Sequence, residues 1–489
     1  MSLALRGARL PEHDGLVDLV IDEGRIVSVT PTGHAVSGAA EQLHLDGRWV
    51  IPGLWDNHVH FTQWARTSRR IDVSDARSAA DAARLVGVAA ADRAGDEVLV
   101  GFGYHPVRWP DEPTRQLLDE VAGARPVVLI AGDLHACWLN SAAARRFAGG
   151  SREAVLREDD AFAVIAALES LDGSETATDA WAHEAARRAA ERGIVGIVDL
   201  EMAWNRDVWM RRIHSGNDTL RVEFGIYAPD LGRAIDLGFR TGSVIEGSSG
   251  LLAVGPFKII TDGSLNTRTA YCFDAYAGSA GDAHPYGVLT VPTDELIALM
   301  ALANEAAIEP AVHAIGDRAN SLALDAFETL GCTGRIEHAQ LLADDDIARF
   351  ARLGVTASVQ PEHAMDDRDV ADELWTGRTR RAFRLAELHG AGVRLALGSD
   401  APVAPLDPWV SIASAVARTR GDREPWHPEN AVSREVALGA SVRTAVAVGE
   451  LADLAIIERD PLACTLAELR RMPVAATLLG GRFTHRALG

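Results

Sequence analysis

The middle of the chain alternates between short apolar runs and longer stretches that mix alanine with charged residues. One of these stretches, residues 180–192, has the composition of a solvated helix, because acidic and basic residues are interleaved along it. The apolar runs are bounded by glycine or aspartate and predict eight strands, at residues 51–61, 194–200, 221–228, 254–261, 311–314, 335–338, 356–359 and 394–399. Eight strands with helices between most of them predict an α/β fold, a (β/α)8 TIM-like barrel.

Two further apolar runs, at residues 98–104 and 126–131, do not fit an eight-stranded barrel. We interpret them as part of an insertion, at about residues 95–150, that follows the first barrel strand. The eight-stranded count depends on this choice, because a chain with ten such strands would give no regular barrel.

The two ends of the chain have the pattern of an antiparallel sheet. Residues 16–29 form two alternating runs joined by an Asp-Glu-Gly turn, and the strand-like runs at residues 42–51, 453–458 and 475–484 have the same character. We therefore expect a small β-sandwich domain assembled from residues 1–52 and 440–489. The barrel would then occupy residues 53–439.

Composition narrows the possible partners and the compartment. The formal net charge of −21 argues against binding to nucleic acid or to anionic membranes. The four cysteines are far apart, which excludes a disulfide framework and a thiolate zinc cluster and suits a reducing compartment. No run approaches the roughly 18 apolar residues of a membrane span, and no secretory cleavage pattern is present. We expect a cytoplasmic protein, with a homodimer as the base-rate expectation for its assembly.

Lys258 is the only lysine among 48 lysine and arginine residues, and it lies in the apolar run at residues 254–261. A lysine amine can lose its proton when it is desolvated and then act chemically, which an arginine cannot do. The plain alternative is codon bias that left one lysine by chance, held by a carboxylate. The other residues expected near Lys258 are needed to distinguish these two interpretations.

Candidate ligands for a metal follow the predicted strands. His58 and His60 are two residues apart at the end of the first strand, so both imidazoles can point to one face. With 16 histidines in the chain, this pair alone is a weak signal. His313, His338 and Asp400, like Lys258, lie at or near the carboxyl ends of later strands, where barrel enzymes assemble their active sites. Singly, each could be an interior histidine or a helix cap. Six such residues on five strands favour a common site.

The chain resembles a known family through motifs that span nearly its whole length. The motifs are residues 52–60, 258–270, 313–319, 337–339, 398–400 and 449–454. They are similar to those of the amidohydrolase superfamily, in its amidohydrolase 3 branch, which contains N-substituted formamide deformylase and YtcJ-like metal-dependent hydrolases. The resemblance implies a metal-dependent hydrolase of carbon–nitrogen bonds other than peptide bonds. The expected substrate is a small amide-type compound, such as an N-acyl or N-formyl compound.

The resemblance also implies the cofactor and the catalytic residues. It implies two divalent metal ions bridged by N6-carboxylated Lys258, with His58, His60 and Asp400 on one ion and His313 and His338 on the other. These ligand types suit zinc without excluding manganese, iron or cobalt. A metal-bound hydroxide would attack the substrate carbonyl, and Asp400 would pass its proton to the leaving nitrogen. Asp400 and His338 are therefore the expected catalytic residues.

Substrate contacts are expected from Tyr104, Trp109, His135 and Asn140 in the insertion. Asp262 and Arg268 follow the bridging lysine and are expected to orient the site or bind substrate, and His363, after the seventh predicted strand, also fits a family pattern. The branch usually carries a Gly-Trp-Asp-like sequence where this chain has Tyr104-His105, which puts a standard pocket in doubt. For each candidate the alternative is local packing or a turn.

Two other functions stay open. One is a mononuclear deaminase or a cyclic amide or lactone hydrolase of the same superfamily, against which Lys258 argues. The other is a non-catalytic binding protein on this fold, against which the complete set of six ligands argues.

Overall fold

The computed structural model describes residues 2–11, 13–33, 41–74, 76–92, 95, 97–104, 109–131, 136–157, 159–171 and 174–488. The chain divides into two compact units. Residues 1–61 and 183–489 form the first unit, and Thr62–Ala182 form the second. The first unit contains the barrel and the sheets built from the chain ends, and the second is inserted between the first and second barrel strands.

The barrel consists of eight parallel strands in sequence order. They are β6 (Leu54–Val59), β12 (Ile194–Asp199), β13 (Arg221–Tyr227), β14 (Leu252–Ile260), β15 (Pro310–Ala314), β16 (Arg335–His338), β17 (Thr356–Val359) and β18 (Leu395–Leu397). A parallel bridge between Val59 and Ala401 joins the two ends of the sheet. The amide of Asp400 also donates to the carbonyl of His58 at 2.7 Å. The predicted barrel is confirmed. Its strands could be predicted because parallel strands that are buried on both faces appear in the sequence as continuous apolar runs.

The first predicted barrel strand has different bounds in the structure. Instead of one strand over residues 51–61, the chain forms β5 (Trp49–Pro52), which pairs with β19 (Leu454–Ile457), and then β6. Gly53 separates them where the backbone passes against the second barrel strand, since a Cβ there would lie 2.3 Å from the side chain of Val195. One uninterrupted apolar run therefore serves two sheets, which the hydrophobic pattern alone does not reveal.

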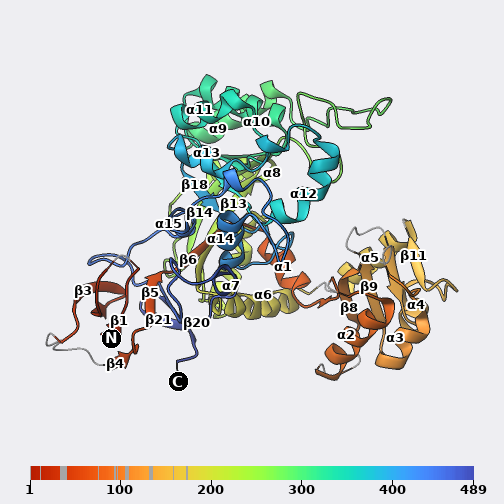
Figure 1. Cartoon of the computed structure of the whole chain (residues 1–489), viewed down its shortest axis with the longest axis horizontal. Helices are drawn as coiled ribbons and strands as arrows, with labels where there is room; N and C mark the ends of the chain where they lie inside the picture. The colour runs from red at the N-terminus through yellow and green to blue at the C-terminus, as the bar shows by residue number, and fades with distance from the viewer. Residues whose placement is uncertain are drawn as a thin grey trace. The chain divides into compact units, whose positions relative to one another are not determined.

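Helices follow most of the barrel strands and surround them (Figure 1). They are α6 (Glu175–Ala190), α7 (Asn205–His214), α8 (Ala228–Asp236), α9 (Thr293–Glu305), α10 (Asp317–Leu330), α11 (Asp344–Leu353), α12 (His363–Leu374), α13 (Leu385–Gly390), α14 (Pro408–Ala417), α15 (Arg434–Gly439) and α16 (Leu466–Arg470), with short 3-10 turns η2 (Thr379–Arg381) and η3 (Pro428–Asn430). In α11, Ile347 and Phe350 are buried at helical spacing while Arg352 stays exposed. Within the described part of the chain, no helix has the length and apolar character needed to cross a membrane.

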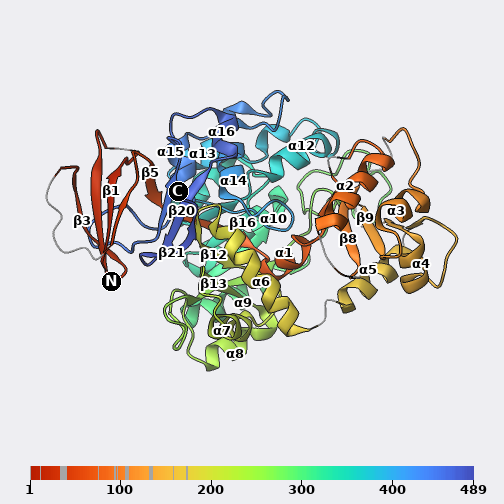
Figure 2. The same cartoon turned by 90° about the horizontal axis from the view of Figure 1, so that it is seen from below.

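The chain ends form two four-stranded sheets that share one hydrophobic core. The first has the order β3 (Arg25–Pro31), β2 (Val17–Asp22), β1 (Leu3–Ala8) and β4 (Glu41–His44), and the second has the order β21 (Arg482–Arg486), β20 (Val474–Leu479), β19 and β5. Leu5 and Leu19 pack in the same buried cluster as Ile456 and Leu478. Figure 2 shows the amino-terminal strands beside the carboxyl-terminal ones. The predicted β-sandwich from both termini is confirmed, and its exact boundaries stay a prediction.

One predicted terminal strand is divided in the structure. The run at residues 42–51 gives β4 and β5, separated by a turn in which Asp46 and Gly47 have φ of 53° and 80°. Aspartate and glycine are among the residues that most readily adopt this left-handed conformation, so the turn breaks a pattern that otherwise looks like a single strand.

The second unit is a five-stranded sheet covered by helices on both faces. Its strands are ordered β11 (Val155–Arg157), β10 (Ala136–Leu139), β9 (Val127–Ala131), β8 (Leu99–Tyr104) and β7 (Ile71–Asp72), and its helices are α1 (Phe61–Thr67, which begins at the end of the first unit), α2 (Ala79–Asp92), α3 (Arg115–Ala122), α4 (Ser141–Phe147) and α5 (Asp159–Leu171). Alternate residues of β9 pack to opposite sides, with Leu129 facing the α2 and α3 cluster and Ile130 the α4 and α5 cluster. The predicted insertion after the first barrel strand is confirmed, and it extends beyond residues 95–150 in both directions.

Candidate metal centre

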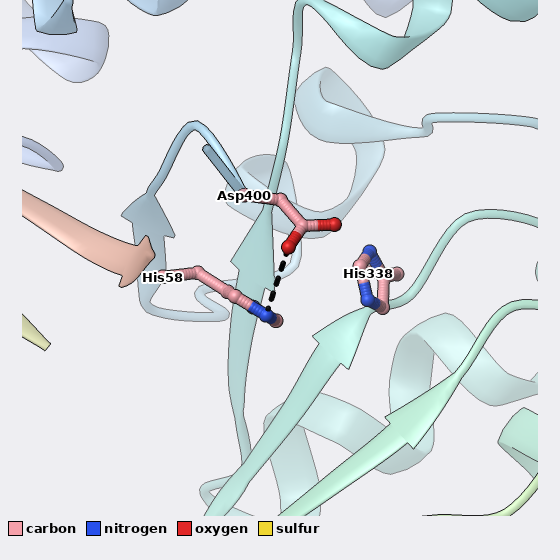
Figure 3. Close-up of side chains that lie close together, drawn as sticks. All are labelled: His58, His338 and Asp400. Carbon is pink, nitrogen blue, oxygen red and sulfur yellow. Dashed lines mark ion pairs between the residues drawn. The ribbon is translucent and has the colours of Figure 1, made fainter. Parts of the chain in front are cut away.

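Three side chains from three distant barrel strands converge at the carboxyl ends of these strands. His58 lies one residue before the end of β6, His338 ends β16, and Asp400 follows β18. One ligand atom of each lies within 4.8 Å of one atom of the others, and all three residues are buried. Figure 3 shows the two imidazoles and the carboxylate directed toward one another. Two imidazoles and a carboxylate are ligand types that suit zinc and related transition metals.

Two of these residues have a backbone conformation that residues other than glycine rarely adopt. The φ angles of His338 and Asp400 are 73° and 56°, in the left-handed region. Each residue stands just where a barrel strand gives way to the following loop, so the positive φ turns the chain at the end of the strand. Such conformations concentrate at functional sites, where surrounding structure enforces them.

The other predicted ligands lie in the same place. The Nζ atom of Lys258 is 3.4 Å from Nε2 of His58, and Nε2 of His60 is 3.3 Å from Oδ1 of Asp400. The ring centroid of His313 lies 4.4 Å from that of His338. All six predicted ligands are therefore neighbours, although the bonds to a metal stay a prediction.

Burial sets the charges of these groups. Desolvation lowers the pKa of Lys258 to about 8, against a smaller raising effect of nearby carboxylates, and Lys258 is only 2% exposed. Desolvation also lowers the pKa of His58 to about 4, so its imidazole is neutral at pH 7. Burial tends to raise the pKa of Asp400, but the neighbouring histidines hold it well below its usual range. The site thus presents a carboxylate and a neutral imidazole, the protonation states that bind metal.

Several buried imidazole nitrogens at this site have no hydrogen-bond partner. Among the described residues, Nδ1 of His60, Nε2 of His313, Nδ1 of His338 and Nε2 of His363 are buried and have no hydrogen-bond partner. Buried polar atoms are rarely left unsatisfied, and four at one site need an explanation. A metal ion that accepts imidazole lone pairs would satisfy such atoms, so the residues present fit a metal centre.

Asp262, predicted to orient the site or bind substrate, is fully buried. Its carboxylate accepts hydrogen bonds from the amides of Ile315, Gly316 and Tyr271, and Oδ1 lies 3.5 Å from Nε2 of His313. Burial raises its pKa to about 7, although the three amides lower it. These contacts tie the loop after β14 to the end of β15, next to a predicted ligand. They favour the orienting role.

His363 and Arg268 differ in their surroundings. His363 is buried at the start of α12, with Nε2 3.9 Å from Oδ2 of Asp400 and its ring stacked 6.0 Å from that of His338. It is therefore a fifth imidazole at the centre. Arg268 has a φ of 55° and an exposed side chain, and its Nη1 lies 3.9 Å from a carboxylate oxygen of Asp282. Substrate contact by either residue stays a prediction.

Tyr104 and Trp109, the first two candidates in the second unit, belong to an aromatic cluster there. The ring of Tyr104 lies 5.8 Å from that of Trp109 and 6.3 Å from that of Trp138. The indole of Trp109 donates to the carbonyl of Ala76 at 3.0 Å. These contacts give both residues a packing role within the unit, and their predicted contact with substrate stays a prediction.

Asn140 caps a helix in the second unit. Its side-chain oxygen accepts hydrogen bonds from the backbone amide of Val127 and from that of Ala143, which lies in the first turn of α4. Its side-chain amide donates to the carbonyl of Arg125. The residue is fully buried, so the structure gives it a structural role. His135 lies outside the described residues. Substrate contact by either stays a prediction.

Two functional candidates were not singled out from the sequence. Glu337 is fully buried, with Oε2 2.7 Å from Nδ1 of His58. Asp56 accepts hydrogen bonds from the amides of His58 and Ser399 and so ties β6 to the segment that carries Asp400. Asp56 lies in the motif at residues 52–60 and Glu337 in the motif at residues 337–339, and these positions were the available signal. It gave them no role, because their partners are distant in the sequence.

Gly398 allows the close approach of β6 and the Asp400 segment. A Cβ at this position would lie 2.7 Å from the amide nitrogen of His58 and 2.9 Å from its Cβ. We expect Gly398→Ala to push two ligand-bearing segments apart, to lower the bound metal measured by elemental analysis and to cost about 1–3 kcal/mol of unfolding free energy. The control is Gly232→Ala in α8, where a Cβ meets nothing within 4 Å. Full metal content in Gly398→Ala would contradict the expectation.

Comparisons with known proteins identify the family of this chain. Residues 43–485 match the profile of the Amidohydrolase family. Protein LONG AFTER FAR-RED 3 of Arabidopsis thaliana is 29% identical, over 90% of this chain and 84% of that protein. N-substituted formamide deformylase of Arthrobacter pascens is 25% identical, over 96% and 95% of the two chains.

A solved structure shares the fold along its whole length. The crystal structure of an uncharacterized metal-dependent hydrolase from Pyrococcus horikoshii superposes with a TM-score of 0.77 at 23% identity, covering 96% of this chain and 99% of that one. The predicted resemblance to amidohydrolases is confirmed by the family match, which covers most of the chain. The chain belongs to the amidohydrolase family and is a hydrolase.

Proposed function

We propose that this protein is a metal-dependent amidohydrolase that cleaves an amide-type carbon–nitrogen bond of a small organic substrate. The observation that carries the proposal is the convergence of five imidazoles, one carboxylate and the sole lysine of the chain at the carboxyl ends of the barrel strands. Active sites of barrel enzymes form at this face. A purely structural cluster gives no reason for so many buried imidazole nitrogens without a hydrogen-bond partner around a buried amine.

The metal-binding residues are proposed to be His58, His60, His313, His338 and Asp400, together with Lys258. When bound, divalent ions such as zinc would supply Lewis acidity and lower the pKa of a coordinated water. Lys258 is proposed to react with carbon dioxide, so that its nitrogen gains a carboxyl group and releases one proton. A pKa of about 8 leaves about one-tenth of the amine neutral at pH 7, which makes this reaction accessible.

Asp400 is proposed as the general base and then the general acid. Its carboxylate is ionised at neutral pH and lies within 3.4 Å of Nε2 of His58 and 3.3 Å of Nε2 of His60. It would accept a proton from the attacking water and deliver it to the leaving nitrogen. His338, whose ligand atom lies within 4.8 Å of those of His58 and Asp400, is proposed to act in catalysis through the metal that it would hold.

An N-formyl or N-acyl amine is the proposed substrate class. The relative named N-substituted formamide deformylase, which matches over nearly the whole of both chains, supports it. A screen of N-formyl amines, N-acyl amines, hydantoins and lactones tests the class. We expect the amides to be hydrolysed, and turnover of only hydantoins or lactones would favour the cyclic substrate class instead.

Metal content tests the binuclear centre. We expect about two divalent ions per chain in protein purified without chelators, and loss of activity after chelation with recovery on adding zinc. A single ion per chain would favour the mononuclear alternative, which the compact trio of His58, His338 and Asp400 could support. Fewer than one ion in fully folded protein would contradict the proposal.

A further inference from the structure

We propose that Glu337 is a positioning residue that fixes the tautomer and orientation of His58, so that Nε2 of this imidazole is available to a metal. The inference rests on the proposed metal centre. Glu337 lies beside a predicted ligand in sequence but contacts a different one in space, 279 positions away. It is fully buried and does not reach solvent.

The Glu337 carboxylate is held between two partners. Oε2 lies 2.7 Å from Nδ1 of His58, and Oε1 lies 2.5 Å from Nε of Arg335. Arg335 is itself fixed, because its Nη2 donates to the carbonyl of Asn57 at 2.6 Å and to Oγ of Ser358 at 2.7 Å. The guanidinium keeps the carboxylate charged in a buried setting, where an unpaired charge would be costly.

A charged carboxylate can only accept hydrogen bonds, so it determines where the His58 proton lies. Nδ1 of His58 must carry the hydrogen and donate it to Glu337. The lone pair of Nε2 then faces Nζ of Lys258 and Oδ1 of Asp400, each 3.4 Å away. Carboxylate partners of this kind orient metal-binding histidines and raise their affinity for the ion.

A competing neighbour makes the choice of tautomer depend on Glu337. The amide nitrogen of Gln360 lies 3.3 Å from the same Nδ1 atom. This nitrogen is a donor, so without the carboxylate it would favour an unprotonated Nδ1 and place the hydrogen on Nε2, where it would block metal binding. Glu337 therefore prevents a tautomer that the surrounding residues would otherwise support.

The backbone explains how two consecutive residues serve the same site. Successive side chains of a strand point to opposite faces, so Glu337 and His338 should diverge. The φ of 73° at His338 ends the strand and turns its imidazole toward the centre that Glu337 supports through His58.

The test is the metal affinity of Glu337→Gln, measured by competition with a chromogenic chelator using zinc. In this variant the amide oxygen would face the positive guanidinium of Arg335 and the amide nitrogen would face His58, which favours the wrong tautomer. We expect affinity to fall about 10- to 100-fold. The matched control is Asp18→Asn, which removes a buried carboxylate 2.7 Å from Nη1 of Arg6 in the terminal sheets and should leave affinity unchanged.

A second variant and a spectrum separate positioning from loss of structure. Glu337→Gln combined with Gln360→Glu restores an acceptor near Nδ1 and should recover part of the affinity. Histidine-selective 15N NMR of the metal-free wild type should show His58 protonated at Nδ1, assigned by its loss in His58→Ala. Unchanged affinity in Glu337→Gln, or an Nε2–H tautomer in wild type, would overturn the inference. A wild type that binds no zinc would instead refute the proposed function.

Discussion

Lys258→Ala should lose bound metal and hydrolytic activity together, and Lys258→Arg should lack both as well. The amine is 2% exposed, has a pKa lowered to about 8 by burial and lies 3.4 Å from His58. These properties suit the proposed reaction of the amine with carbon dioxide, whose product would hold the metal ions. Arginine keeps its proton in proteins and cannot form a comparable bridge. Metal content and turnover of N-formyl and N-acyl amines are measured on the same preparations.

Lys258→Met serves as the control for packing. Its unbranched side chain fills most of the same space without an amine, so it should fold but show the metal loss of Lys258→Ala. Intact-protein mass spectrometry under non-acidic conditions should find one added carboxyl group on wild type and none on these variants. Full metal and full turnover in Lys258→Arg would refute a bridging carbamate.

Asp400→Asn should reduce turnover by about 10²- to 10⁴-fold, the usual effect of losing a general acid–base. Asparagine has nearly the same shape and keeps an oxygen toward the cluster, but it cannot accept the proton of the attacking water at neutral pH. Loss of metal should be smaller than in Lys258→Ala, because one neutral oxygen ligand remains. The measurement is kcat at saturating zinc, so that weakened metal binding is separated from the lost proton transfer.

Asp407→Asn is the matched control in the same segment of chain. Asp407 caps α14 and pairs with Arg192 at 2.8 Å, a structural role outside the His58, His338 and Asp400 cluster. We expect this variant to lose stability but to keep kcat. If Asp400→Asn turned over substrate at the wild-type rate, the carboxylate would not be the acid–base.

Short-range patterns were sufficient to predict most of the architecture. The barrel strands are buried on both faces, so each appears as a compact apolar run, and all eight were found. The predictions failed where local pattern and tertiary role diverge. Gly53 divides an apolar run between two sheets, and the turn at Asp46 and Gly47 divides another. At Gly53 the break depends on the segment that packs against the backbone, which the residues in the run do not encode. At Asp46 and Gly47 the break is a local turn with positive φ, which the apolar pattern alone did not separate from a strand.

The candidate site was predictable in its ligand types and incomplete in its supporting residues. Ends of parallel strands meet at one face, so His58, His313 and the other ligands could be grouped from strand positions alone. Glu337 could not be assigned, since strand alternation would point it away from the site beside His338. Its function comes from a contact with His58 across the barrel.

The sequence by itself determined the family, the barrel and the six ligand types of the proposed centre, because strand ends and residue chemistry are local properties. The tertiary structure decided which groups support those ligands: Glu337 against His58, and Asp262 beside His313. It also decided that the backbone turns at His338 and Asp400. These features depend on distances between segments far apart in the chain, and only the packed barrel sets those distances.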